Sequence, residues 1–176
     1  MNKIVFPRNT LVLLCGPAGC GKSTFAAKHF LPTQIVSSDH CRALISDDPT
    51  NQGVTGHAFD LMHFIIEKRL RLGRLTVADA THLKREDRKP VIKIARRFGF
   101  NAAAIVFNIP LELCIARNRA RARRVPEGAL RAQYDLLINT AVTIRREGFD
   151  YVSVLDEISQ SEANVKIARP VNRKDM

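Results

Sequence analysis

GPAGCGKS, residues 16–23, is the stretch of this 176-residue chain that decides its fold. It matches the pattern GxxxxGK[ST], in which glycines let backbone N–H groups converge on phosphate oxygens. The apolar run Thr10–Cys15 precedes it and predicts a buried strand, whereas residues 22–30 predict a helix. A helix that begins there adds the positive end of its dipole. The stretch therefore predicts a phosphate-binding loop, or P-loop, for a nucleoside triphosphate.

The side chains of the P-loop predict how the triphosphate is held. Lys22 is expected to reach the β- and γ-phosphates, and the Ser23 hydroxyl is expected to ligate Mg²⁺ directly, with Mn²⁺ as an alternative metal. The residues expected to contact the nucleotide here are Gly16, Pro17, Ala18, Gly19, Cys20, Gly21, Lys22, Ser23 and Thr24. The motif predicts nucleotide binding but leaves the reaction open.

Strand and helix patterns alternate along the rest of the chain. Apolar runs predict strands over residues 10–15, 35–37, 75–78, 102–107 and 151–155. Helices are predicted over residues 22–30, 56–72, 90–98, 111–123 and 127–146, with Pro90 in a first turn. Such alternation predicts an α/β three-layer sandwich of the P-loop NTPase type, with a central parallel sheet of about five strands.

The charge balance predicts the kind of partner. The chain has 28 Lys and Arg against 17 Asp and Glu, a net charge of +11, which favours polyanions such as nucleic acid. The four cysteines lack CxxC spacing and a nearby histidine cluster, so we expect reduced thiols and no zinc site. Neither a secretion signal nor a long apolar run is present, so we expect a cytoplasmic protein with no membrane contact.

Acidic residues follow two of the predicted strands. Asp39 comes after the second strand, where a carboxylate could take the proton of an attacking hydroxyl, and Arg42 could hold an acceptor phosphate. The alternative for Asp39 is a helix N-cap. Asp79 ends the third strand, and it could act as a more distant Mg²⁺ contact or as a hydrogen-bond anchor for the P-loop. His82 is interpreted as a surface loop residue without a chemical role.

Five arginines gather in eight residues after the fourth strand. On a continuous helix, Arg117, Arg121 and Arg124 would share one face and could close over phosphates, whereas Arg119 and Arg123 would form a solvated face. We call residues 111–126 the lid. The alternative is that the whole cluster is a solvated basic surface.

These motifs together resemble the 5′-kinase module of bacterial polynucleotide kinase–phosphatases, within the polynucleotide-kinase-like P-loop phosphotransferases. The resemblance runs from about residue 11 to residue 155. It includes the P-loop and residues 23–25, 36–39 with Arg42, 46–48, 54–56, 77–81 and 107–110, and the lid.

The resemblance implies transfer of the γ-phosphate of ATP, with Mg²⁺, to 5′-OH ends of RNA or DNA during end repair. It implies that Asp39 is the general base, that Arg42 contacts the acceptor's phosphate, and that Val54 and Thr55 contact the terminal nucleoside. Arg117 and Arg124 would engage the donor phosphates, with Arg121 in a less defined role. We expect residues 1–167 to form the kinase domain and 168–176 a basic tail, or a linker to a missing phosphatase or other end-healing domain.

Two other functions fit parts of the sequence. One is a P-loop kinase for a small molecule such as a sugar, an antibiotic or another metabolite. The other is a catalytically silent module that binds nucleic acid in a nucleotide-dependent way. Retention of Lys22, Ser23 and Asp39 argues against the silent module, and the charge of +11 argues against a neutral acceptor.

Overall fold

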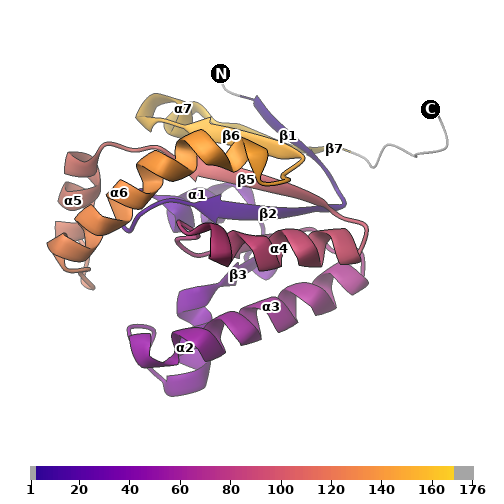
Figure 1. Cartoon of the computed structure of the whole chain (residues 1–176), viewed down its shortest axis with the longest axis horizontal. Helices are drawn as coiled ribbons and strands as arrows, with labels where there is room; N and C mark the ends of the chain where they lie inside the picture. Colours follow the sequence, from indigo (N-terminus) through magenta and orange to yellow (C-terminus); the bar gives the residue numbers. More distant parts are fainter. Residues whose placement is uncertain (1–2, 169–176) are drawn as a thin grey trace.

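A five-stranded parallel sheet lies at the centre of the computed structural model, which describes residues 3–168 (Figure 1). The strands are β2 (Thr10–Cys15), β3 (Ile35–Ser37), β4 (Thr76–Asp79), β5 (Asn101–Phe107) and β6 (Tyr151–Leu155), in the order β3-β4-β2-β5-β6. Every residue of β2 is buried, which explains why this strand is a continuous apolar run rather than an alternating one. The predicted fold class and all five predicted core strands are confirmed.

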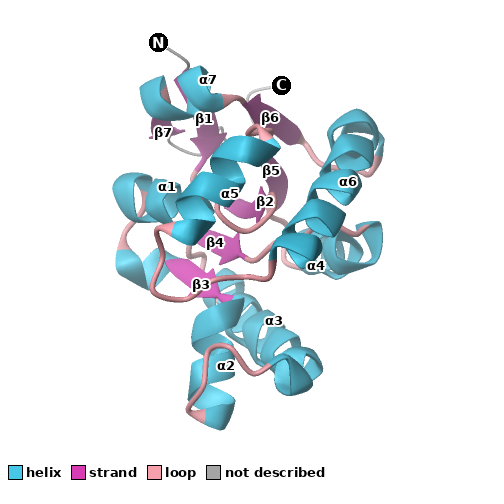
Figure 2. Ribbon diagram, turned by 90° about the vertical axis from the view of Figure 1, so that its left-hand side faces the viewer, coloured by secondary structure: helices cyan, strands magenta, loops and turns pink. Residues whose placement is uncertain are grey.

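Helices cover both faces of this sheet (Figure 2). On one face, α3 (Thr55–Arg71), α4 (Arg85–Arg97) and α6 (Glu127–Thr143) pack against β2 through a cluster that contains Leu13 and Met62. On the other, α1 (Lys22–His29) and α5 (Leu111–Arg119) pack against β2 through a cluster that contains Leu14 and Phe25. The remaining helices are α2 (Ser38–Ser46), α7 (Glu157–Glu162) and the 3-10 turns η1 (Pro32–Gln34), η2 (Gln52–Val54) and η3 (Ile144–Arg146).

A second, two-stranded sheet was not predicted. It pairs β1 (Lys3–Pro7) with β7 (Asn164–Ala168) in parallel. Ile4 and Phe6 alternate with exposed residues along β1 and join the hydrophobic cluster beneath α1. Ala168, expected to begin the basic tail, is the last residue of β7, and the rest of that tail lies outside the described residues.

Two predicted helix boundaries were wrong. Helix α4 begins at Arg85, five residues before the expected start, so Pro90 lies inside the helix rather than in its first turn. Glu86 and Asp87 in the first turn favour this earlier start because they complement the helix dipole. Helix α5 ends at Arg119 rather than Arg123, which changes the geometry of the lid.

The state of the cysteines and the length of the helices bear on two expectations from the sequence. Cys15, Cys20, Cys41 and Cys114 are all buried free thiols. Over residues 3–168, none of the helices has both the length and the apolar character that a membrane crossing requires.

Candidate active site

The P-loop connects β2 to α1 at the carboxyl end of the central strand. Gly19 and Gly21 have positive φ angles of 79° and 94°, in the left-handed region that glycine adopts without strain. Gly19 is also packed closely, since a Cβ atom there would clash with the carbonyl oxygen of Cys114. Glycine is therefore required at this position by both conformation and space.

Lys22 and the start of α1 supply the positive charge of this loop. The buried Lys22 side chain places its Nζ 2.8 Å from the carbonyl oxygens of Gly16 and Pro17. Helix α1 has neither a side-chain cap nor an acidic residue in its first turn. Its first N–H groups are therefore available to an anion, which is the arrangement that phosphate-binding helix ends use.

Asp79 at the end of β4 contacts the P-loop helix directly. In the register of the parallel strands, Asp79 lies opposite Leu14, and Ser23 donates a hydrogen bond from Oγ to Asp79 Oδ2 over 2.8 Å. Burial raises the pKa of the Asp79 carboxyl, while the charge of Lys22, the Ser23 hydrogen bond and the charge of Arg121 act in the opposite direction. The hydrogen-bond anchor, one of the two roles left open for Asp79, is therefore present in the structure.

The pair Ser23 and Asp79 also fits a magnesium ion. A hydroxyl and a carboxylate oxygen are ligand types that Mg²⁺ takes, and Mg²⁺ uses one or two carboxylates together with substrate phosphates. Within residues 3–168, no group of three or more His, Cys, Asp or Glu side chains is arranged to hold a metal ion. A metal at this position would depend on phosphate oxygens to complete its coordination.

Asp39 lies on the neighbouring strand end, in the first turn of α2. The side chain of Ser37 accepts the capping hydrogen bond from the His40 N–H, so the interpretation of Asp39 as the N-cap was wrong. The carboxylate of Asp39 is instead shared between two guanidinium groups. Arg42 contacts Oδ1, and Arg123 contacts Oδ2 at 2.9 Å. Arg42 is itself buried, whereas Asp39 is about half exposed.

The lid has a different shape from the continuous helix that was predicted. After Arg119 the chain turns, and Asn118 closes the turn by donating to the Val125 carbonyl and accepting from the Val125 N–H, at 2.8 and 3.0 Å. Arg121 and Arg124 lie on this turn and are exposed, so the predicted single helical stripe with Arg117 was wrong. Pro126, immediately before α6, contributes to this interruption of the helix, because proline disfavours the helical conformation at the residue before it.

The arginines of the lid divide by partner. Arg117 points toward Gln160 of α7, with 3.5 Å between Nη1 and Oε1, and Arg119 pairs with Glu127 on the surface at 3.0 Å. Arg123 was expected on a solvated face with Arg119, and this was wrong for Arg123, which reaches across to Asp39. The lid is thereby joined to α2.

Val54 and Thr55 lie where η2 meets α3, and both are half-buried. The Thr55 hydroxyl donates to the carbonyl oxygen of Gln52 at 2.8 Å, which fixes the start of α3. Helix α3 packs against α2, the helix that carries Asp39. The turn η2, which ends at Val54, also packs against α2.

Two glutamines at the P-loop were missed by the sequence analysis. Gln133 of α6 accepts a hydrogen bond from the Ala18 N–H at 2.8 Å, and Gln160 of α7 donates to the Cys20 carbonyl at 2.9 Å. They come from 115 and 140 residues further along the chain, and no local motif marks either of them. Only the folded arrangement brings α6 and α7 to the loop.

His82 was expected on the surface, but it is completely buried. Its Nδ1 lies 2.9 Å from the carbonyl oxygen of Leu14, so Nδ1 carries the proton. Burial lowers the pKa of His82 to about 4, and the neutral ring packs edge-on against Phe59. The backbone of His82 has a positive φ angle of 44°. His82 thus supports the end of β2 that leads into the P-loop.

Comparison with known proteins places this site in a family. A protein-family model described as an AAA domain matches residues 11–138, which is most of the chain and includes the P-loop, Asp39, Asp79 and the whole lid. The chain belongs to the AAA-domain family. Membership implies ATP binding at the P-loop, and with the site geometry it supports a P-loop kinase. No curated protein sequence matches the chain.

Solved structures share the fold at low sequence identity. A chain of the Pnkp1/Rnl/Hen1 RNA repair complex superposes with a TM-score of 0.67 at 20% identity, covering 78% of this chain and 47% of that one. The APS kinase CysC of Mycobacterium tuberculosis gives 0.55 at 16%, covering 89% and 96%. A gluconokinase of Sinorhizobium meliloti gives 0.54 at 16%, covering 86% and 84%. At these identities the likeness shows a shared fold and leaves the acceptor open.

Proposed function

We propose that this chain is an ATP-dependent polynucleotide 5′-hydroxyl kinase. The observation that carries the proposal is the Asp39 carboxylate, which is held between the guanidinium groups of Arg42 and Arg123. Its charge is near enough to Asp79 to act on the pKa of that carboxyl. A carboxylate can accept the proton of a hydroxyl, and guanidinium groups bind phosphate through paired hydrogen bonds. A hydroxyl that stands next to a phosphate fits both groups, and the 5′ end of a nucleic acid strand is such an acceptor.

The donor half of the reaction would depend on the P-loop. Its N–H groups and the start of α1 would hold the β- and γ-phosphates of ATP, and Lys22 would turn its ammonium group from the Gly16 and Pro17 carbonyls toward them. Arg117, which contacts Gln160, and Arg121, whose charge acts on Asp79, would offset negative charge on the transferring group. Arg124 is assigned the same role from its place on the lid.

The acceptor half would begin at Asp39. Asp39 would take the proton of the 5′-OH, and the freed oxygen would form a bond to the γ-phosphorus as the bond from that phosphorus to the bridging oxygen of ADP breaks. The proton would then pass from Asp39 to solvent, which the half-exposed carboxylate can reach. Arg42 would bind the phosphate that follows the terminal nucleoside, and Val54 and Thr55 would contact that nucleoside.

Magnesium would be held by Ser23, with Asp79 orienting the Ser23 hydroxyl through the hydrogen bond already formed. When bound, the ion would neutralise charge on the β- and γ-phosphates. The raised pKa of Asp79 would bring its carboxylate into the ionised form only at a pH above the usual aspartate range.

A small-molecule kinase is the second candidate, because the same fold occurs in a gluconokinase and an APS kinase. A small acceptor would need a single anchoring group beside Asp39, whereas two arginines and a net charge of +11 favour an acceptor with several phosphates. The silent binding module is disfavoured because the P-loop contacts are intact: Lys22 is bonded to the Gly16 carbonyl, and Ser23 is bonded to Asp79.

The proposal is tested by a panel of acceptors. The protein is incubated with Mg²⁺ and γ-labelled ATP, and with 5′-OH RNA, 5′-OH DNA, gluconate, or adenosine 5′-phosphosulfate. We expect label on an oligonucleotide, and none with Lys22→Ala, because that variant lacks the ammonium group that meets the phosphates. Label on a small molecule alone would establish the second candidate instead. ATP binding without transfer to any acceptor would favour the silent module.

A further inference from the structure

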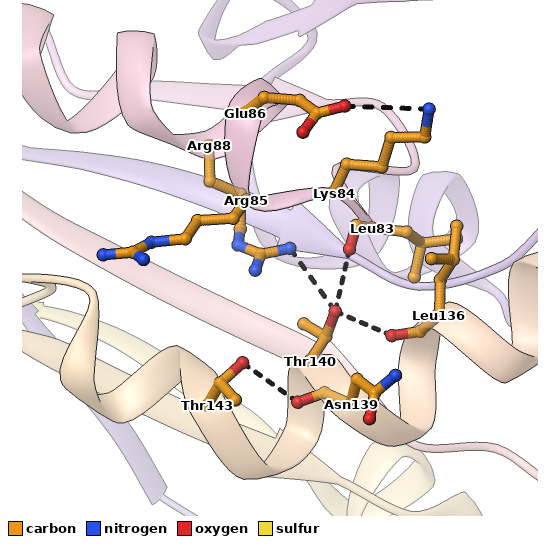
Figure 3. Close-up of a pocket in the computed structure, with 9 residues that line it drawn as sticks. All are labelled: Leu83, Lys84, Arg85, Glu86, Arg88, Leu136, Asn139, Thr140 and Thr143. Carbon is orange, nitrogen blue, oxygen red and sulfur yellow. Dashed lines mark hydrogen bonds and ion pairs between the residues drawn. The ribbon is translucent and has the colours of Figure 1, made fainter.

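A groove lies between the start of α4 and the second half of α6, on the face of the sheet opposite α1 (Figure 3). It has a volume of about 370 Å³ and is lined by Leu83, Lys84, Arg85, Glu86, Arg88, Leu136, Asn139, Thr140 and Thr143. A volume in this range can take one nucleotide-sized group. None of the site residues described above lines it.

The floor of the groove is held by internal hydrogen bonds and an ion pair, and its rim is exposed. Thr140 donates to the Leu83 carbonyl at 2.8 Å and lies 3.4 Å from Arg88 (Figure 3). The guanidinium of Arg88 is bound to Glu147. These groups have their partners within the fold. The rim carries the exposed cations of Lys84 and Arg85 and the exposed amide of Asn139, while the exposed side chain of Leu136 offers apolar surface and Leu83 is buried beneath it.

The rim of the groove continues as a basic face along α4. At about 100° per residue, Arg85, Lys89 and Lys93 follow one another at 40° steps on one side of the helix. All three are exposed, and among the described residues none of them forms an ion pair. From residue 88 to residue 97, α4 contains no acidic residue. Like charges at this spacing repel, so the face is best stabilised by an anion that spans it.

A second pair of cations borders the same groove. The turn η3 follows directly after the groove residue Thr143 and carries Arg145 and Arg146, both exposed. The buried pair of Arg88 and Glu147, with 2.6 Å between Nη2 and Oε1, ties this turn to α4. Lys84 and Arg85 thus line the groove from the α4 side, and Arg145 and Arg146 follow directly after its last lining residue on the α6 side. Glu86 is the acidic exception, and it pairs with Lys84 at 3.7 Å.

The groove is within reach of the candidate active site. Leu83 follows Asp79 by four residues, so their Cα atoms lie at most about 14 Å apart. The face from Arg85 to Lys93 extends a further distance of about 12 Å along the helix. With a phosphate about every 3.4 Å along a stacked strand, each of these spans corresponds to about four nucleotides.

We propose that the α4–α6 groove and the basic face of α4 bind the single strand of nucleic acid that continues from the reacting 5′ end. Lys89 and Lys93 contact phosphates, and the groove takes one nucleobase against Leu136, with Asn139 at the base edge. This rests on the proposed polynucleotide kinase function and deepens it: the enzyme prefers acceptors several nucleotides long over dinucleotides.

The test compares Lys89→Ala/Lys93→Ala with a matched control, Lys3→Ala/Lys166→Ala. The control removes the same charge from exposed positions on the small β1–β7 sheet. Binding of a labelled 12-nucleotide single strand is measured by fluorescence anisotropy over a range of salt concentrations. Each lost phosphate contact lowers the slope of log affinity against log salt by about 0.7, so the test variant is expected to lose about 1.4. The control is expected to keep the wild-type slope.

Transfer rates separate the failure of this proposal from failure of the function. For Lys89→Ala/Lys93→Ala we expect kcat/KM to fall about tenfold on the 12-mer and to stay unchanged on a dinucleotide. Transfer to the 12-mer with test and control variants behaving alike would overturn the binding surface and leave the kinase function intact. Tighter binding of polyglutamate than of the 12-mer would overturn it in favour of an acidic protein. Absence of transfer to every oligonucleotide would remove both proposals.

Discussion

At the scale of single residues, Asp39 has a set of contacts suited to positioning a base. Both carboxylate oxygens accept from arginines, Arg42 from within α2 and Arg123 from the lid. A carboxylate has about four lone-pair positions, so two contacts leave capacity for a hydroxyl proton. Its half-exposed position lets an acceptor approach from solvent.

Replacing Asp39 by Asn keeps the size of the side chain and removes the proton acceptor. We expect kcat for transfer to a 5′-OH oligonucleotide to fall about 100-fold or more, the usual range for loss of a general base, with KM for ATP unchanged. Asp60→Asn, on the exposed side of α3, is the matched control and should keep full activity. An Asp39→Asn variant as fast as the wild type would show that Asp39 only organises arginines.

His82 makes a prediction about acid stability. Its pKa is lowered to about 4 by burial, from an ordinary value of 6.5. Between those pH values the unfolded chain binds a proton that the folded protein does not, so the free energy of unfolding falls as the pH drops. His82→Asn tolerates the positive φ and lacks this titration. From pH 7 to pH 4 we expect urea unfolding to show a loss smaller by about 3 kcal/mol than in the wild type. Equal losses would contradict the prediction, since His29 and His63 are present in both proteins.

At the scale of elements, the lid consists of helix α5 and the turn that connects it to α6, and hydrogen bonds hold this turn in place. The paired hydrogen bonds of Asn118 with Val125 close the turn, and Arg123 connects it to α2. Arg123 thus contacts Asp39, while Arg117 contacts Gln160 and the charge of Arg121 acts on Asp79. Movement of this element would change these interactions together.

Arg123→Gln should separate the two sides of the lid. Because Arg123 contacts Asp39 and not the P-loop, we expect KM for the oligonucleotide to rise about tenfold, equivalent to about 1.4 kcal/mol, with KM for ATP unchanged. Arg119→Gln, whose partner is Glu127 on the surface, is the control and should alter neither. A rise in KM for ATP alone would assign Arg123 to the donor phosphates.

The elements that could be predicted from sequence are those with a local signal. The core strand Thr10–Cys15 is one apolar run, and the P-loop has fixed spacing, so both were predicted with their bounds. The pairing of β1 with β7 joins the two ends of the described chain and has no local signature. The prediction of one arginine face was wrong because it assumed a continuous helix past Arg119. The helix ends there, and Asn118 forms hydrogen bonds with Val125 across the turn that follows.

The residues of the candidate site likewise fall into a group that the sequence could predict and a group that it could not. Lys22, Ser23 and Asp79 could be assigned to one site because strand ends in a parallel sheet meet at one edge. Contacts made by Arg123, Gln133 and Gln160 come from elements that only tertiary packing brings to that edge. Sequence alone could not distinguish the arginine that reaches Asp39 from those that stay in solvent.

At the scale of the whole molecule, the carboxyl edge of the sheet carries two clusters of polar residues, the P-loop with Asp79 and Asp39 with its two arginines. The centre of the sheet carries the P-loop and Asp79, and the edge strand β3 leads to Asp39 with its arginines. The net charge of +11 attracts polyanions at long range, and the basic face of α4 concentrates part of that charge on one surface. The molecule is thus proposed to bind a triphosphate in the loop and a strand across its surface.

The central claim is phosphoryl transfer to the 5′ end of a strand, and the position of the label tests it most directly. The protein is incubated with Mg²⁺, γ-labelled ATP and one oligonucleotide in two forms, one with a 5′-OH and one already carrying a 5′-phosphate. The account predicts label on the first form only, released by removal of the 5′-terminal phosphate. Equal labelling of both forms, or label on neither while a small hydroxyl compound is phosphorylated, would contradict it.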